Sequence, residues 1–457
     1  MSGAVAAGNS HSAEAGAWAL REGGTAVDAA LAATFAAFVT EGPLTGPAGG
    51  GFLLLEEPGA DAVVLDCFFA VPSGSPGEME EVVIDFGDAS TQVFHIGEAS
   101  FAVPGLVPGL EEAHARLGRL PWERLFVPAL ELARRGVEPE PAQAVLLEIL
   151  VPILQREAGG RRIYGTPGTI DARDLVPTLD LIRAARSEAI AMLLPELAAE
   201  LMAYAVESRA PLLGSIAGTT VLTTPAPSRG GIVVQTGLAA LDERGEDATG
   251  SPSEARSLAK ALEAGYEAAG PGSAHGARPT GTTNVSAIDG DGAAVALSST
   301  LGSGSGVFRH GFQLNNMLGE LDVIGQEARE PGARLPSMMA PTIVLDEGEP
   351  RLVVGSAGSV RLAGAILQVV AGVVRQGLAV REAISRPRLH VDGLTVHVEG
   401  GWPDGVADAL AEAGFDPVLW AAANLFFGGT SAVERRPDGS LGAAGDPRRG
   451  GVGVTVR

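Results

Sequence analysis

The segment from 268 to 300 constrains the fold of this chain more than any other. Residues 268–281 read Ala-Ala-Gly-Pro-Gly-Ser-Ala-His-Gly-Ala-Arg-Pro-Thr-Gly. They contain almost nothing that could enter a core, so we expect a flexible linker. Directly after it, two short alternating runs over 281–300 flank an Asp-Gly-Asp-Gly turn, which predicts a β-hairpin.

The register of this hairpin decides which side chains meet. If Ile288 faces Ala293 across the turn, antiparallel pairing places Thr282 opposite Ser299, with Thr300 adjacent. A bulge at either turn glycine would shift this register by about one residue. The hairpin therefore brings hydroxyl residues that are distant in sequence within reach of each other.

A threonine at the start of such a strand could act as a nucleophile. Its hydroxyl needs a base, and the hairpin segment 281–300 contains no histidine. If the chain were cut before Thr282, the new α-amino group, with a pKa of roughly 8, could serve as that base. Gly281 could adopt the strained geometry that such a self-cleavage requires. From the residues alone, an ordinary Thr-rich edge strand is the simpler interpretation.

Composition excludes several other classes of function. The formal charge is -23, from 32 Lys+Arg against 55 Asp+Glu, which repels nucleic acid and anionic membrane surfaces. Cys67 is the single cysteine, so an intrachain disulfide is ruled out, and we interpret it as a core residue. The seven histidines have no metal-ligand spacing, and we expect neither a metal nor another cofactor. Without a secretory signal or a membrane-spanning run, we expect a soluble, cytoplasmic protein.

The remaining pattern alternates helices and strands. Residues 12–40 predict two small-residue helices, with Ser12 capping the first and Thr25 opening the second. Strands are expected at 52–55 and 62–65, a helical layer over 105–215, two strands within 220–236, and further strands at 285–300, 342–355 and 394–399. Helices are expected near 361–384 and 404–414. We interpret Gly302-Ser303-Gly304-Ser305-Gly306 as a mobile lid, Arg448-Arg449 as a surface or subunit contact, and 424–427 as packing.

Motifs spread over nearly the whole chain resemble the gamma-glutamyltranspeptidase family of the N-terminal-nucleophile hydrolase superfamily. They run in family order and include Ser10-His11, Ala26-Val27-Asp28-Ala29-Ala30, Gly49-Gly50-Gly51-Phe52, Val103-Pro104-Gly105, Pro225-Ala226-Pro227-Ser228, Leu314-Asn315-Asn316, Pro341-Thr342, Gly355-Ser356-Ala357-Gly358 and Gly445-Asp446-Pro447-Arg448-Arg449-Gly450-Gly451.

The resemblance implies an α+β fold, a four-layer αββα sandwich with a helical layer in the N-terminal part. It also implies a precursor that splits between Gly281 and Thr282 into a larger subunit, 1–281, and a smaller one, 282–457. Thr282 would attack a γ-glutamyl or other acyl amide to give an acyl-enzyme, which water or an acceptor amine resolves. Thr300 matches the threonine that holds the nucleophile's amino group, and Gly358 and Ser359 match the backbone donors of the oxyanion hole.

Substrate-binding positions depart from the family pattern. Phe68 stands where the family has the arginine that binds the glutamyl α-carboxylate. Gly302, Glu320 and Met338 replace an asparagine, an aspartate and a serine, while Ser337 remains. The pattern predicts a small-molecule amide substrate whose acyl group is more apolar than glutamate.

Three alternatives stay open. The carboxylate contact could come from Arg309 instead, which would leave a true glutathione hydrolase. The substrate could be an acylated β-lactam nucleus, oxamate or poly-γ-glutamate, or the enzyme could cleave a carbon-carbon bond. The fold could also be a scaffold without catalysis. A homodimer of processed chains is open as well.

Overall fold

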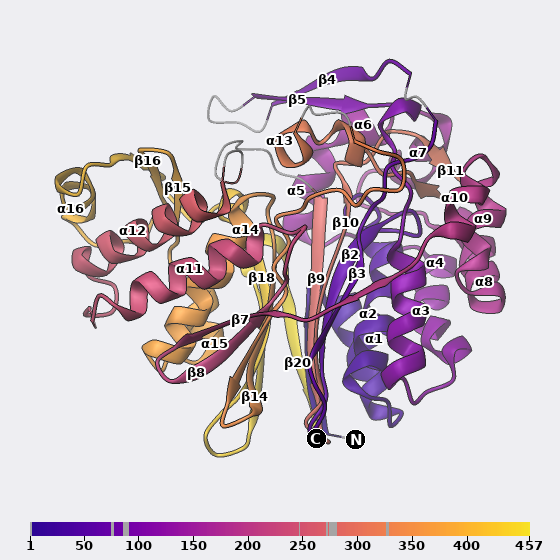
Figure 1. The fold of residues 1–457 in the computed structure, drawn as a ribbon. Coiled ribbons are helices and arrows are strands. Elements are labelled where there is room, and N and C mark those ends of the chain that lie inside the picture. The colour runs from indigo at the N-terminus through magenta and orange to yellow at the C-terminus, as the bar shows by residue number, and fades with distance from the viewer. Residues whose placement is uncertain are drawn as a thin grey trace.

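Two antiparallel sheets form the centre of the molecule (Figure 1). The computed structural model describes residues 2–74, 77–85, 91–245, 247–270, 273, 281–325 and 329–457. The seven-stranded sheet has the order β20 (Val452–Val456), β1 (Gly3–Ala7), β9 (Gly281–Asp289), β10 (Ala294–Gly302), β2 (Gly50–Glu56), β3 (Val63–Cys67) and β6 (Glu207–Arg209). The six-stranded sheet has the order β19 (Leu441–Gly445), β18 (Gly429–Arg435), β14 (Glu349–Ala357), β13 (Thr342–Asp346), β8 (Thr219–Thr223) and β7 (Leu212–Ile216).

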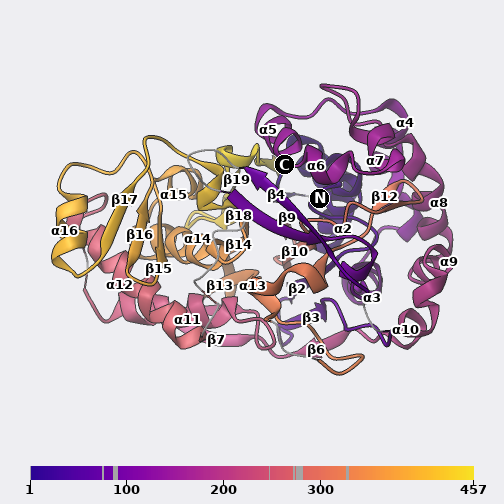
Figure 2. The ribbon, with the colours of Figure 1, turned by 90° about the horizontal axis from the view of Figure 1, so that it is seen from above.

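The two sheets face each other, and helices cover their outer faces (Figure 2). β9 and β10 of the first sheet pack against β14 of the second. The first sheet is covered by α1 (Ser10–Arg21), α2 (Ala26–Thr40) and α3 (Leu106–Leu117), and the second by α11 (Gly230–Asp242), α14 (Arg361–Val370) and α15 (Val380–Ser385). The chain is therefore a mixed helix and sheet protein with the β9–β10 hairpin at its centre.

Smaller elements surround this body. The helical layer predicted over 105–215 is present as α3 together with α4 (Val127–Arg135), α5 (Pro141–Ile149), α6 (Val151–Leu154), α7 (Ala158–Tyr164), α8 (Val176–Ala185), α9 (Glu188–Leu193) and α10 (Ala198–Ala203). The end of that range was predicted wrongly, because it forms strands β6 and β7, which pair with β3 and β8. The remaining elements are α12 (Pro252–Ala269), α13 (Leu321–Ile324), α16 (Val406–Glu412), the hairpins β4 (Glu80–Asp85) with β5 (Thr91–Ile96) and β11 (Phe308–Arg309) with β12 (Phe312–Gln313), and a sheet of β15 (Leu389–Asp392), β16 (Thr395–Val398) and β17 (Asp416–Leu419).

The first two helices confirm the small-residue prediction, with one correction at their start. Thr25 and Asp28 form a reciprocal capping box at α2, as expected of the residue that opens this helix. α1 is capped by Asn9, whose side chain accepts a hydrogen bond from the Ser12 amide at 2.9 Å. Ser12 itself lies in the first turn, so its prediction as the cap was wrong.

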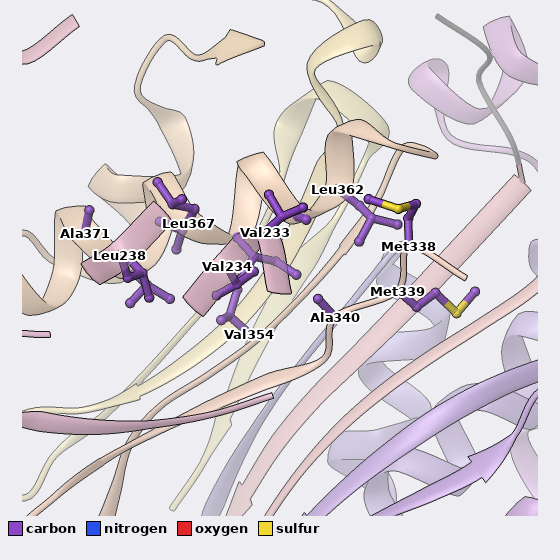
Figure 3. Packing of buried hydrophobic residues seen from close by; sticks show 14 of the residues in the cluster. Val233, Val234, Leu238, Met338, Met339, Ala340, Val354, Leu362, Leu367 and Ala371 are labelled. Carbon is purple, nitrogen blue, oxygen red and sulfur yellow. The ribbon is translucent and has the colours of Figure 1, made fainter. Parts of the chain in front are cut away.

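The second predicted strand within 220–236 is instead the helix α11. Its run of β-branched residues favours a strand by propensity, but the buried residues Val233, Val234 and Leu238 follow helical spacing. Figure 3 shows them packed against Leu367 of α14. Gly230 lets the helix approach the chain before β13, because a Cβ there would overlap the carbonyl oxygen of Met338. Tertiary packing overrides the local preference here.

The predicted linker lies mostly outside the described residues. Helix α12 continues to Ala269, so the first two residues assigned to the linker are helical. Residues 271–272 and 274–280 are not described. At Gly281 the described chain resumes as the first residue of β9, where the hairpin was expected to begin.

Side chains of the hairpin alternate between two cores. Ala294 and Ala296 of β10 belong to the core between the sheets, and Val295 and Leu297 belong to the core beneath α1 and α2. By the same alternation, Thr282 lies on the face toward the second sheet and Thr283 on the face toward α2. The two neighbouring threonines therefore serve different environments.

None of the described helices combines the length and apolar character that crossing a bilayer requires. Within those same residues, no three His, Cys, Asp or Glu side chains gather as metal ligands.

Candidate active site

Thr282 and Thr300 lie directly opposite each other at one end of the β9–β10 hairpin. Both are buried, at 3% exposure each. The predicted register was off by the one residue that a bulge would supply: Ile288 faces Ala294, and Ala293 belongs to the turn. The carboxylate of Asp289 makes this larger turn, because its Oδ1 accepts hydrogen bonds from the amides of residues 291 and 293 at 3.0 Å each.

Thr300 is hydrogen-bonded to the peptide bond that precedes Thr282. Its hydroxyl donates to the carbonyl oxygen of Gly281 and accepts from the Gly302 amide at 2.8 Å. Gly281 itself is tightly enclosed, since a Cβ there would overlap the Gly302 carbonyl oxygen and lie 2.9 Å from that of Pro43. The arrangement polarises the Gly281 carbonyl, which is the group that a Thr282 hydroxyl would attack.

A cavity of about 330 Å³ opens beside this pair. Eight of the predicted site residues line it: Phe68, Thr282, Thr300, Gly302, Glu320, Ser337, Met338 and Ser359. Gly358 is not among the lining residues but directly precedes Ser359. The wall also contains four residues that the sequence analysis did not single out, Met317, Val323, Met339 and Leu362. All four follow a predicted site residue or motif within three positions, which is the only signal that the sequence offers for them.

The turn between β14 and α14 carries Gly358 and Ser359. Ser359 has a φ of 57°, a left-handed conformation that is uncommon for a residue with a side chain, and Gly358 has a φ of 133°. A Cβ at Gly358 would lie 2.9 Å from the Cα of Gly428. Successive amides in such a turn, just before a helix, are suited to hold an anionic oxygen.

Phe68 lines the cavity and also belongs to the hydrophobic core. It is 1% exposed and stacks on Phe52 with ring centroids 5.3 Å apart. Its carbonyl oxygen accepts from the Tyr204 hydroxyl at 2.5 Å and from Arg334 at 3.0 Å. An aromatic side chain held in this way offers no hydrogen bond to a carboxylate.

Arg309 does not replace the missing arginine. Its guanidinium pairs with Glu98 at 2.7 Å and lies 3.8 Å from Glu196, and it does not line the cavity. The hypothesis that Arg309 supplies the carboxylate contact is therefore not supported by the geometry.

The glycine-rich segment 302–306 is a buried loop and not the predicted mobile lid. The side-chain oxygen of Asn316 accepts from the amides of Ser303 and Gly304, and Glu320 accepts from the amide and the hydroxyl of Ser303 at 3.0 and 2.7 Å. Gly302 has a φ of 69°, and a Cβ there would overlap Asn316. The loop therefore fixes Glu320 at the cavity wall.

A second cavity, of about 570 Å³, meets the first only at Thr282. Its wall includes Glu41, Thr283, Leu425 and Arg449. Burial raises the pKa of Glu41 to about 7, against the opposing hydrogen bond from Thr283. Glu41 was not predicted from the sequence, where it is one carboxylate among many at the end of a helix.

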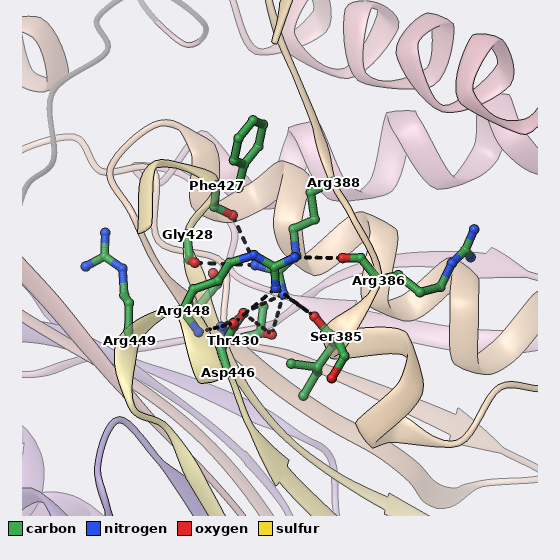
Figure 4. Close-up of polar contacts among 12 residues, drawn as sticks. Ser385, Arg386, Arg388, Phe427, Gly428, Thr430, Asp446, Arg448 and Arg449 are labelled. Carbon is green, nitrogen blue, oxygen red and sulfur yellow. Dashed lines mark hydrogen bonds and ion pairs between the residues drawn. The ribbon is translucent and has the colours of Figure 1, made fainter. Parts of the chain in front are cut away.

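Arg448 and Arg449 are built into the molecule, contrary to the prediction of a surface contact. The Arg448 side chain is 3% exposed and pairs with Glu399 at 2.6 Å and Asp446 at 3.1 Å. Asp446 also pairs with Arg388 at 2.5 Å (Figure 4). Burial lowers the pKa of Arg449 to about 10, and in Figure 4 its guanidinium points away from this cluster. Phe427, from the segment predicted as packing, is buried, whereas Leu425 lines the second cavity.

The fold class is shared with a known acylase. The solved structure of cephalosporin acylase from Bacillus halodurans matches with a TM-score of 0.84, covering 99% of this chain and 95% of that one at 19% identity. The family model of gamma-glutamyltranspeptidase matches residues 12–181 and 266–456, and the chain belongs to this family of hydrolases and acyltransferases. The resemblance seen in the sequence is thereby confirmed.

Two curated relatives span almost the whole chain. The glutathione hydrolase proenzyme of Pseudomonas aeruginosa is 29% identical, covering 100% of this chain and 95% of that protein. The acylase ACY 1 proenzyme of Pseudomonas sp. (strain SE83) is 27% identical, covering 97% of this chain and 91% of that protein. Both are named as proenzymes.

Proposed function

We propose that this chain is a proenzyme of the four-layer αββα type that cuts itself between Gly281 and Thr282, leaving subunits of residues 1–281 and 282–457. The observation that carries the proposal is the hydrogen bond from the Thr300 hydroxyl to the Gly281 carbonyl, beside a cavity that Thr282 lines. It is supported by the proenzyme names of both relatives. Thr282 is then the nucleophile of the mature enzyme.

The reaction follows from the groups at hand. After the cut, the α-amino group of Thr282, with a pKa of roughly 8, takes the proton of its own hydroxyl. Oγ1 attacks the substrate amide carbonyl, and the amides of Gly358 and Ser359 hold the oxyanion. Collapse breaks the C–N bond as the Thr282 ammonium gives its proton to the leaving nitrogen, so the amine departs and an acyl-enzyme remains on Thr282. Water or a second amine then attacks the ester and releases the acyl group, while Thr300 holds the amino group in place.

The acyl group is expected to be more apolar than glutamate. Phe68, Met317, Val323, Met338, Met339 and Leu362 give the cavity a largely apolar wall. Losing a charge-assisted contact to a carboxylate costs on the order of 1.5–3 kcal/mol, so a glutamyl group gains little here. The apolar cavity wall therefore favours an acylase over a glutathione hydrolase.

Two p-nitroanilides with the same leaving group test this specificity. We expect kcat/KM for hexanoyl-p-nitroanilide to exceed that for γ-glutamyl-p-nitroanilide by about tenfold or more, because only the glutamyl compound buries an unmatched carboxylate. Faster turnover of the γ-glutamyl compound, or of glutathione, would show that the family's specificity is retained. Turnover of none of them by a chain that stays intact would favour the non-catalytic scaffold.

A further inference from the structure

A second polar pair lies behind the Thr282–Thr300 pair, on the opposite face of the same hairpin. Thr283 and Ser299 face each other across β9 and β10. The Thr283 hydroxyl donates to Oε2 of Glu41 at 3.0 Å, and the hydroxyls of Ser299 and Thr45 are hydrogen-bonded at 2.8 Å. The short loop after α2, which contains Glu41 and Thr45, therefore contacts both residues of this second pair. Thr283 and Ser299 are the chain neighbours of Thr282 and Thr300.

This loop is itself closely fitted to the cleavage site. The carbonyl oxygen of Glu41 accepts from the amides of Leu44 and Thr45, and the Leu44 carbonyl accepts from the Leu301 amide at 3.0 Å. Gly8 leaves room for the Glu41 carboxylate to reach Thr283, because a Cβ there would overlap Oε1 of Glu41. Because β9 is closely packed at this point, a change in the Glu41–Thr283 contact should shift the end of β9 that carries Thr282.

Glu41, which contacts Thr283 of the second pair, is a titratable group. It is 4% exposed, and burial raises its pKa to about 7, into the range where the enzyme would work. The groups facing it are the Thr283 and Asn9 side chains, which favour the carboxylate, the negative Glu140, which disfavours it, and the positive Arg449, which favours it. Its charge therefore changes near neutral pH.

We propose that Glu41 is a positioning residue for the nucleophile: its carboxylate form orients Thr283 and so holds the strand end that presents Thr282. The proposal rests on the function of Thr282 proposed above. An ionised carboxylate only accepts hydrogen bonds, so Thr283 must donate to it, and that bond is charge-assisted. A protonated carboxyl carries a donor of its own, which removes the constraint on the Thr283 hydroxyl.

The pH dependence of turnover separates this role from a merely structural one. In wild type, both Glu41 and the Thr282 amino group must lose a proton, so log kcat/KM for hexanoyl-p-nitroanilide rises with a slope of two below about pH 7. Glu41→Gln has no proton to lose at this position, so its slope should fall to one. Thr283→Val should also give a slope of one, with kcat/KM reduced about 10- to 100-fold at pH 8, because the lost hydrogen bond is charge-assisted.

Glu56→Gln is the matched control. Burial raises the pKa of Glu56 to about 7 as well, but it pairs with Ala294 at the far end of β10. The slope of log kcat/KM against pH for Glu56→Gln should remain two. Equal slopes in wild type and Glu41→Gln, or a slope of one in Glu56→Gln, would overturn the proposal.

A second measurement needs no turnover. In full-length Thr282→Ala with 15N-labelled threonine, the amide resonances of Thr283 and Thr300 should shift together with a midpoint near pH 7, and Glu41→Gln should abolish both shifts. Absence of the shifts overturns the positioning role. Their presence in a chain whose wild type shows no new terminus at Thr282 would sink the proposed function alone.

Discussion

The hydroxyl of Thr300 donates a hydrogen bond to the carbonyl oxygen of Gly281, the residue before Thr282. The contact joins the ends of two strands that pair along their whole length. Under the proposed self-cleavage, Thr300 acts on the bond that is cut, and the same position would then face the new amino group of Thr282. One residue can serve both steps because the hairpin register fixes it opposite Thr282.

Removing the Thr300 hydroxyl should slow self-cleavage. Thr300→Val keeps the shape but loses the donor to the Gly281 carbonyl, and loss of one such donor typically slows a reaction about 100-fold. Thr300→Ser keeps the donor and should process within a few fold of wild type. Timed gel electrophoresis after cell-free synthesis measures the rates, and equal rates for the valine and serine variants would contradict this role.

Phe68 should matter for stability as well as for the substrate. Phe68→Ala opens a cavity beside Phe52 and should lower the free energy of unfolding by about 3–5 kcal/mol in urea titrations. Met192, with 63% exposure, supplies the control, since Met192→Ala should change it by less than about 0.5 kcal/mol. A small effect at Phe68 would mean that its ring is not part of the core.

The buried carboxyl of Glu41 should make the protein less stable at alkaline pH. Its folded pKa of about 7 lies above the ordinary value of 4.5, so its stabilising contribution is complete below about pH 4.5 and is lost as pH rises through 7. The shift corresponds to roughly 3 kcal/mol. Glu41→Gln should therefore gain stability relative to wild type between pH 5 and pH 8, as thermal unfolding at both values would reveal. A constant difference between the two proteins would argue against a raised pKa.

The ion pair of Arg388 and Asp446 should be costly to break. Both side chains are at most 2% exposed, so Arg388→Met leaves a buried carboxylate with one cation fewer and should cost about 3–5 kcal/mol of unfolding free energy. Arg173→Met removes an arginine that is 71% exposed and paired with Asp171, and should change the free energy of unfolding far less, because solvent screens the pair. Similar losses in the two variants would show that burial does not govern the pair.

The sequence was most informative where pattern and chemistry coincide. Alternation and turn residues predicted the β9–β10 hairpin, and the family motifs predicted eight residues that line one cavity. The predicted register of the hairpin was wrong by one residue, because hydrogen bonds to the Asp289 side chain set the size of the turn. A turn of this kind cannot be read from hydrophobic periodicity.

Other features depend on contacts between distant segments. Nothing local distinguishes Glu41 from a solvated carboxylate, because its partner is 242 residues away. The sequence predicts Arg448 at a surface or subunit contact, whereas it is paired with Glu399 and Asp446 in the interior. Gly230 and Gly231 lie within the region 220–236, where two strands are expected, whereas they are the close-packed start of helix α11. Such contacts are tertiary, and local sequence carries little trace of them.

Intact-mass analysis of purified wild type beside Thr282→Ala tests the central claim most directly. We predict two fragments for wild type, residues 1–281 and 282–457, whose masses sum to that of the chain plus one water, and a single uncut chain for the variant. An uncut chain in both preparations, or a cut at the same bond in Thr282→Ala, would contradict the assignment of Thr282 as the residue that cleaves the chain.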